Sequence, residues 1–331
     1  MVIDFVGKRF FYIILSALIV VPGFISLLIP PRLRPGIEFT SGTLATIRFE
    51  REIEQGQLRD ALTRVGHGDA IIQHTADGDY LIRTRILRQE QRGGETGEVV
   101  ETGERAELVN GLRETFGPLT VLSYDEVSPI VAGEIAQRSA LAVIVASVFI
   151  LLYISFAFRQ VPRPFRYGTS AILAMIHDVL VVLGVFSIMG KVFGTEIDSM
   201  FITAVLTVIG FSVHDTIVVF DRTRENLRRL PGREFGDVVN VSLNQTLARS
   251  LTTSLTVVFT LVALLLFGGI TIRNFVLTLL IGIISGTYSS IFIASQLLVM
   301  WEYGELNPSR WFGGNKAEAA PARPEAAARS R

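Results

Sequence analysis

The chain of 331 residues contains no cysteine, so it cannot form a disulfide or use a thiol as a nucleophile or metal ligand. Basic and acidic residues number 31 each, so the net charge points to no class of partner. The sequence also lacks a glycine-rich phosphate loop, the GxSxG and HExxH motifs, and any Cys/His spacing typical of a metal site. We therefore expect no enzyme activity, no cofactor and no metal centre.

Hydrophobic residues make up 49% of the chain, and the mean hydropathy is +0.45. Several apolar runs approach the roughly 20 residues that a helix needs to cross a bilayer. These runs are residues 10–30, 140–158, 170–189, 200–226, 251–267 and 275–301. The first is too long for a signal peptide, and no small-residue cleavage site follows it. The sequence therefore predicts a mostly α-helical membrane protein with six transmembrane helices.

A charged segment without a membrane span separates the first two runs. Apolar residues alternate over 43–49, as in a half-buried strand, and recur at helical spacing over 58–65. Two strands at 70–74 and 80–86, a helix ending at 116 and a strand at 119–124 follow. The order β-α-β-β-α-β is typical of an α+β ferredoxin-like domain.

The predicted organisation has four parts. Residues 1–30 hold the N-terminus and the first helix, 31–137 the α+β domain, 138–303 helices two to six, and 304–331 a disordered tail. Within the α+β domain, residues 89–103 are rich in glycine and glutamate and are predicted to form a mobile loop.

Basic residues gather at the N-terminus, in the loops after the second and fourth helices, and in the tail. The positive-inside rule places these segments, and both termini, in the cytoplasm, and the α+β domain on the other side. The same rule, or contact with anionic membrane lipids, explains the basic segment 222–233 without a nucleic acid partner.

The fourth apolar run carries His214 and Asp215 well inside its length. An ionised Asp at such a depth costs about 2.5–3.5 kcal/mol, so it is retained for a reason. Asp215 could be a salt-bridged structural residue, a proton-relay group or a metal ligand. We favour the relay, and metal binding is least favoured because adjacent residues point about 100° apart on a helix and do not chelate from one face.

Arg249, at the start of the fifth run, is the expected partner of Asp215. Asp215 precedes Asp221, near the cytoplasmic end of its helix, by about 9 Å at 1.5 Å per residue. The long side chain of Arg249 could extend along the apolar surface to reach it. A stripe of threonines continues the same face of that helix, at 252, 253, 256 and 260. An ordinary positive-inside arginine is the alternative.

His177 and Asp178 repeat the His-Asp pair within the third run, and with His214 they form a possible second polar site. Interhelical hydrogen bonding that fixes packing is an equally good interpretation. Gly282 and Gly286 form a GxxxG pair in the sixth run, which predicts close helix packing.

These features together resemble the SecF family. The resemblance covers residues from about 10 to 301. It rests on the six spans, on GIEFTSGT at 36–43, on IHDV at 176–179 and on GFSVHDTIVVFDRTREN at 210–226. The family belongs to the resistance-nodulation-division superfamily, and its intramembrane Asp and span-five Arg fall on Asp215 and Arg249. Because the residue before the family's Asp varies, no proton-transfer role carries over to His214.

The resemblance implies a subunit of the Sec protein-export machinery in the bacterial inner membrane. Such a subunit works with SecD and the SecYEG channel, and indirectly with SecA and YajC, on translocating preproteins. It uses protons as the coupling ion. A proton-coupled small-molecule efflux protein of the same superfamily and a non-conducting assembly factor are the alternatives. The length of this chain favours the export subunit over efflux.

Overall fold

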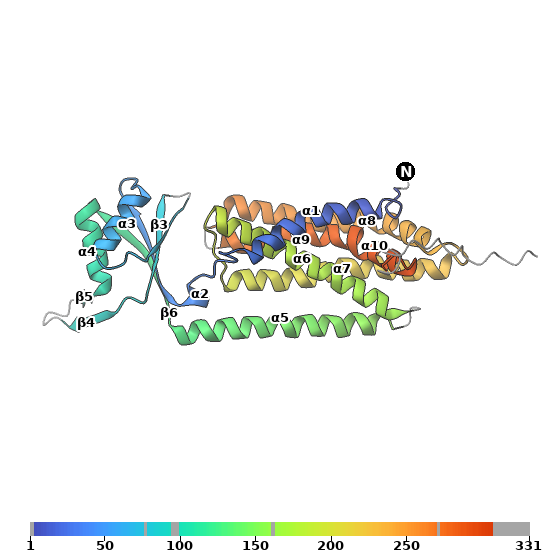
Figure 1. Cartoon of the computed structure of the whole chain (residues 1–331), viewed down its shortest axis with the longest axis horizontal. Coiled ribbons are helices and arrows are strands. Elements are labelled where there is room, and N and C mark those ends of the chain that lie inside the picture. The colour runs from blue at the N-terminus through green and yellow to red at the C-terminus, as the bar shows by residue number, and fades with distance from the viewer. Residues whose placement is uncertain (1–2, 76–77, 94–98, 160–162, 270–271, 307–331) are drawn as a thin grey trace, which may run out of the picture.

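The computed structural model describes residues 3–75, 78–93, 99–159, 163–269 and 272–306. Figure 1 shows a long helical bundle with a small α/β domain at one end of its long axis. The bundle holds the apolar runs of the sequence, and the α/β domain holds the charged segment between the first two.

Six helical segments of the described chain are long and apolar enough to cross a membrane, which confirms the predicted six-helix architecture. They are α1 (Arg9–Leu28), α5 (Pro129–Ala157), α6 (Pro164–Val192), α7 (Ser199–Arg229), α8 (Phe235–Phe267) and the segment from Arg273 to Glu302. The last consists of α9 (Arg273–Ser289), the π-helical turn η2 (Ser290–Ala294) and α10 (Ser295–Glu302).

Helix α5 begins at Pro129, earlier than the apolar run that starts at Ala140. Ser128 caps it, because the Ser128 hydroxyl accepts a hydrogen bond from the backbone N–H of Val131 at 3.4 Å. Proline at the first helical position suits this start, since its missing N–H has no partner there in any case. The helix therefore extends beyond the apolar run toward the α/β domain, and it lies along the side of the bundle (Figure 1).

The α/β domain contains a four-stranded antiparallel sheet in the order β2-β3-β1-β6. Its elements are α2 (Ile37–Thr40), β1 (Gly42–Phe49), α3 (Gln55–Arg64), β2 (Ile71–His74), β3 (Asp79–Thr84), α4 (Glu104–Phe116) and β6 (Leu119–Val127). Ala45 and Ile47 alternate into the core, where they pack with Leu58 of α3 and Leu108 of α4. The four strands of this sheet and the helices α3 and α4 follow the predicted order β-α-β-β-α-β, with a further pair of strands between β3 and α4.

One prediction in this domain is wrong. Within residues 89–103, where the sequence predicts a mobile loop, β4 (Gln89–Gly93) and β5 (Val99–Gly103) pair as antiparallel strands. Residues 94–98 lie outside the described part. The glycine and glutamate content did not predict these strands. Backbone N–H and C=O groups make the hydrogen bonds between them, and these groups are present whatever the side chains.

Candidate functional site

Asp215 lies on the inner face of α7 and is 3% exposed. Its Oδ2 atom accepts a hydrogen bond from the hydroxyl of Ser254 on α8 at 3.4 Å. The hydroxyl of Thr287 on α9 is in turn 2.6 Å from that of Ser254. A short chain of hydroxyls therefore leads from the carboxyl across three helices.

Arg249 does not pair with Asp215 in this structure. It is exposed, and among the described residues its guanidinium forms no ion pair. The reason is the rotation of α8: Ser250 and Ser254, one turn apart, face the bundle and are buried. Arg249 precedes Ser250 by one residue and so points about 100° away from that face. Arg249 therefore lies on a helix that neighbours Asp215, but its side chain points outward, away from the carboxyl.

Asp178 on α6 is 1% exposed and lies at the junction of three helices. Its carboxylate accepts hydrogen bonds from Ser212 of α7 at 2.6 Å, and from Ser285 and Ser289 of α9 at 2.7 and 2.6 Å. Three hydroxyls satisfy most of the acceptor capacity of this buried group. The arrangement joins α6, α7 and α9 at one point.

The two histidines lie in different surroundings. The Nδ1 atom of His177 is 3.0 Å from Oδ1 of Asp178, and its Nε2 atom is buried without a partner among the described residues. His214 lies on the exposed face of α7. The structure therefore brings His177 and Asp178 together and leaves His214 outside their cluster.

The glycine pair of α9 accounts for the close approach of α7. A Cβ atom on Gly282 would lie 2.1 Å from Cγ2 of Val208, and one on Gly286 would lie 3.2 Å from Cβ of Ser212. The π-helical turn begins directly after this contact, at Ser290. Such turns are rare and often stand at functional sites. Small residues on α9 thus bring the serines of α7 and α9 within reach of Asp178.

Sequence reasoning placed the carboxyls but missed several hydroxyls of the hydrogen-bonded network around them. Ser254, Thr287 and Ser285 were not singled out, since serine and threonine are common in membrane helices. Ser285 and Ser289 are one turn apart and flank Gly286, which is a usable signal. No group of three His, Cys, Asp or Glu side chains in the described part of the chain could hold a metal ion.

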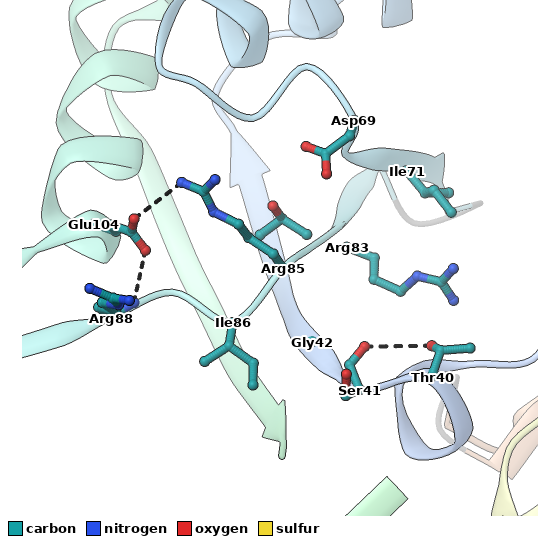
Figure 2. Close-up of a pocket in the computed structure, with 11 residues that line it drawn as sticks. Thr40, Ser41, Gly42, Asp69, Ile71, Arg83, Arg85, Ile86, Arg88 and Glu104 are labelled. Carbon is teal, nitrogen blue, oxygen red and sulfur yellow. Dashed lines mark hydrogen bonds and ion pairs between the residues drawn. The ribbon is translucent and has the colours of Figure 1, made fainter. Parts of the chain in front are cut away.

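A groove of about 890 Å³ in the α/β domain is a further candidate site. Figure 2 shows that Glu104 bridges the side chain of Arg85 and the backbone N–H of Arg88. That N–H bond lowers the pKa of Glu104 from its ordinary value. Arg83, on the same groove, pairs with Glu196 of the α6–α7 loop at 3.0 Å. These charged groups therefore pair with one another or, for Arg83, with Glu196 of the membrane part.

The comparisons with known proteins agree on one family. A family model described as the C-terminal part of the protein export membrane proteins SecD and SecF matches residues 108–304. The protein translocase subunit SecF of Thermobaculum terrenum is 51% identical over 301 residues, which cover 91% of this chain and 94% of that protein. The SecF subunit of Anaerolinea thermophila is 40% identical over 324 residues, with 97% and 99% coverage.

A solved structure with the same fold is SecDF from Thermus thermophilus, described as a translocon-associated membrane protein. The TM-score is 0.78 at 32% identity, over 92% of this chain. SecDF in a super-membrane-facing form gives a TM-score of 0.61 at 30% identity, over 94% of this chain. This chain spans only 39% and 40% of those two longer chains.

Proposed function

Because the chain belongs to the SecF family of protein-export membrane proteins, we propose that it uses the proton motive force to promote translocation of preproteins. It acts with SecD at the SecYEG channel, after the SecA ATPase step, with YajC as an indirect partner. The match to a solved SecDF structure supports SecD as the partner. Protons are the coupling ion, and the chain itself catalyses no covalent chemistry.

The environment of Asp215 carries the proposal. This carboxyl is buried within a membrane helix, with one long hydrogen bond and no lysine or arginine in contact among the described residues. An ionised carboxylate buried without a cation is costly, so this environment favours the protonated acid. An approach of the Arg249 guanidinium would stabilise the ionised form and release that proton.

The surroundings of Asp178 differ from those of Asp215 and indicate a different role. Three serine hydroxyls and His177 already satisfy its carboxylate, so a cation is not needed to hold it in place. We assign this cluster to packing of α6, α7 and α9, the second of the two interpretations that the sequence allows. Asp215 and Arg249 then form the proton relay, and Asp178 fixes the helices around it.

The exposed polar groups of α7 and α8 support a membrane partner. Thr207 and Thr256 bond back to carbonyls of their own helices at 2.9 and 2.7 Å, which lets them face lipid at little cost. His214 and Arg249 are exposed, and their side chains make no such bond to any residue that the structure describes. A second membrane subunit that covers this face would satisfy both, and SecD is the partner we propose.

The protein lies in the bacterial inner membrane with both termini in the cytoplasm, and its α/β domain is on the far side with the emerging preprotein. The placement of the basic residues supports this orientation and is independent of the site.

Export into inverted membrane vesicles, with and without an imposed proton gradient, tests the proposal. Asp215→Asn keeps the shape of the side chain and cannot ionise, so it should abolish the gradient-stimulated part of export and leave the gradient-independent part. Asp221→Asn is the matched control, because this residue lies on the same helix with its side chain 56% exposed. An efflux protein or a passive assembly factor would show no gradient-stimulated export to lose.

A further inference from the structure

The outer end of α7, the helix that carries Asp215, is capped by two carboxylates. Asp198 accepts a hydrogen bond from the backbone N–H of Phe201 at 2.7 Å, as an N-cap residue does. Glu38 accepts from the backbone N–H of Ser199 at 2.5 Å. The N–H groups at a helix start have no partner within the helix and carry partial positive charge, so both contacts are favourable.

Glu38 does not belong to the membrane bundle. It lies on α2, the short helix that leads directly into β1. β1 is an inner strand of the sheet, paired with β3 on one side and β6 on the other. Ser41, which links α2 to β1, and Gly42, the first residue of β1, have φ values of 66° and 125°. Glu38 thus joins the start of a membrane helix to the centre of the outer α/β domain.

Backbone hydrogen bonds next to Glu38 strengthen this connection. Gly36 donates to the carbonyl of Ile197 at 2.8 Å, and Ile197 donates to the carbonyl of Arg34 at 2.8 Å. The segment that precedes α2 therefore runs parallel to the segment that precedes α7. Any axial shift of α7 pulls directly on the polypeptide that enters β1.

We propose that Glu38 is a coupling residue, which transmits a shift of α7 to the outer α/β domain through its bond to the helix start. Asp215 lies about 25 Å along α7 from this bond, at 1.5 Å per residue. Because α7 is one continuous helix from Ser199 to Arg229, a movement at Asp215 reaches Ser199 without an intervening hinge. The inference rests on the proton-driven function proposed above, and it adds the path by which that function does mechanical work.

The acidic character of the contact agrees with this assignment. Burial raises the pKa of Asp198 from its ordinary value, and the negative charge of Glu38 adds to the effect. Two carboxyl groups thus share one helix start, which is a strained arrangement unless the positive end of α7 stays between them. A displacement of α7 changes the contacts of both groups at once.

Distance measurements between spin labels test the coupling in the full-length protein with its SecD partner in lipid nanodiscs. Because the chain has no cysteine, labels at Arg64→Cys on α3 and Phe193→Cys at the outer end of α6 are unambiguous, and both positions are exposed. Asp215→Asn, which imitates the protonated state, and the wild type at alkaline pH, where the acid can ionise, should give different distance distributions. In Glu38→Ala this difference should disappear.

Two further variants separate coupling from a folding defect. Glu38→Gln keeps an oxygen that can accept from Ser199, so it should restore most of the difference in distance. Glu114→Ala is the matched control, because Glu114 is an exposed residue of α4 that makes no ion pair among the described residues. An undiminished difference in Glu38→Ala would overturn the inference.

Export assays separate this inference from the proposed function. Glu38→Ala should lose the gradient-stimulated part of export at least five-fold and keep the gradient-independent part. If Asp215→Asn abolishes stimulation and Glu38→Ala does not, the proton site stands and the coupling path is wrong. If Asp215→Asn retains full stimulation, the proposed function itself fails, whatever Glu38→Ala does.

Discussion

Asp215 on α7 and Ser254 on α8 are joined by a hydrogen bond of 3.4 Å, at the place where the sequence predicts an ion pair with Arg249. Ser254 and Arg249 lie on one helix, about 140° apart around its axis and about 7.5 Å apart along it. A rotation of α8, together with extension of the long arginine side chain along the helix, would bring the guanidinium to the carboxyl. The same helix thus carries both the hydrogen-bond partner of Asp215 in this structure and its proposed ionic partner.

Removal of the Asp178 carboxylate should destabilise the bundle strongly. Asp178→Ala leaves the hydroxyls of Ser212, Ser285 and Ser289 without their shared acceptor, at a cost of roughly 2–5 kcal/mol. The thermal unfolding temperature of the purified protein in detergent measures this effect. Asp221→Ala should leave that temperature nearly unchanged, since its side chain is 56% exposed. Equal unfolding temperatures for the two variants would contradict the packing role of Asp178.

A methyl group at Gly282 should also lower stability, for a steric reason. Its Cβ atom would lie 2.1 Å from Val208 Cγ2, and overpacking of this kind costs about 1–3 kcal/mol. The double variant Gly282→Ala with Val208→Ala should recover most of the loss in unfolding temperature. Gly210→Ala is the control, because nothing lies within 4 Å of the Cβ position there. A loss that Val208→Ala does not relieve would argue against contact of α7 and α9 at this point.

Much of the fold could be predicted from local patterns. The apolar runs predicted the membrane helices. The alternation of apolar residues predicted β1, because a strand buried on one face has a period of two residues, and Ala45 and Ile47 are buried. The start of α5 at Pro129 was missed because hydropathy marks only the apolar part of a helix, whereas a capping serine and a proline mark its true beginning.

The site was only partly predictable. Asp178 and Asp215 stand out in the sequence because charged groups are costly in a membrane helix. Their partners depend on how α8 and α9 are rotated and aligned against α7, and no local pattern encodes that register. A rotation of one residue separates Ser250, which is buried, from Arg249, which is exposed. Here the sequence alone was insufficient.

The contact of the outer domain with the α6–α7 loop should depend on pH. Burial raises the pKa of Glu196 from its ordinary value, although Arg83 acts in the opposite direction. A carboxyl with a raised folded-state pKa contributes stability that is present below its unfolded pKa and is lost as the pH rises through the folded one. Asp198, whose pKa burial also raises, acts in the same sense.

Glu196→Gln should therefore reduce the fall in unfolding temperature between about pH 4 and pH 7. The glutamine keeps an oxygen for Gln73, which donates to Glu196 at 3.1 Å, and it removes the charge that pairs with Arg83. Unfolding temperatures of wild type and variant, measured side by side over this range, isolate the contribution of this one group. Parallel curves would show that Glu196 does not titrate in the transition.

Single cysteines should report the predicted orientation, because the chain contains none. A cysteine at Arg163, an exposed residue between α5 and α6, should be protected from an impermeant maleimide added outside intact cells. A cysteine at Glu114 of the α/β domain, also exposed, should react. If Arg163→Cys were labelled from outside, the predicted orientation would be wrong, and the α/β domain would lie in the cytoplasm.

The most direct test of the central claim is gradient-stimulated export by wild type, Asp215→Asn, Arg249→Met and the double variant in inverted vesicles. Without a guanidinium to approach it, Asp215 should stay protonated, so Arg249→Met should lose the stimulated part of export as fully as Asp215→Asn does. The double variant should then be no worse than either single one, since both changes act on one element. Full gradient-stimulated export by Asp215→Asn would contradict the account and leave Asp215 with a packing role.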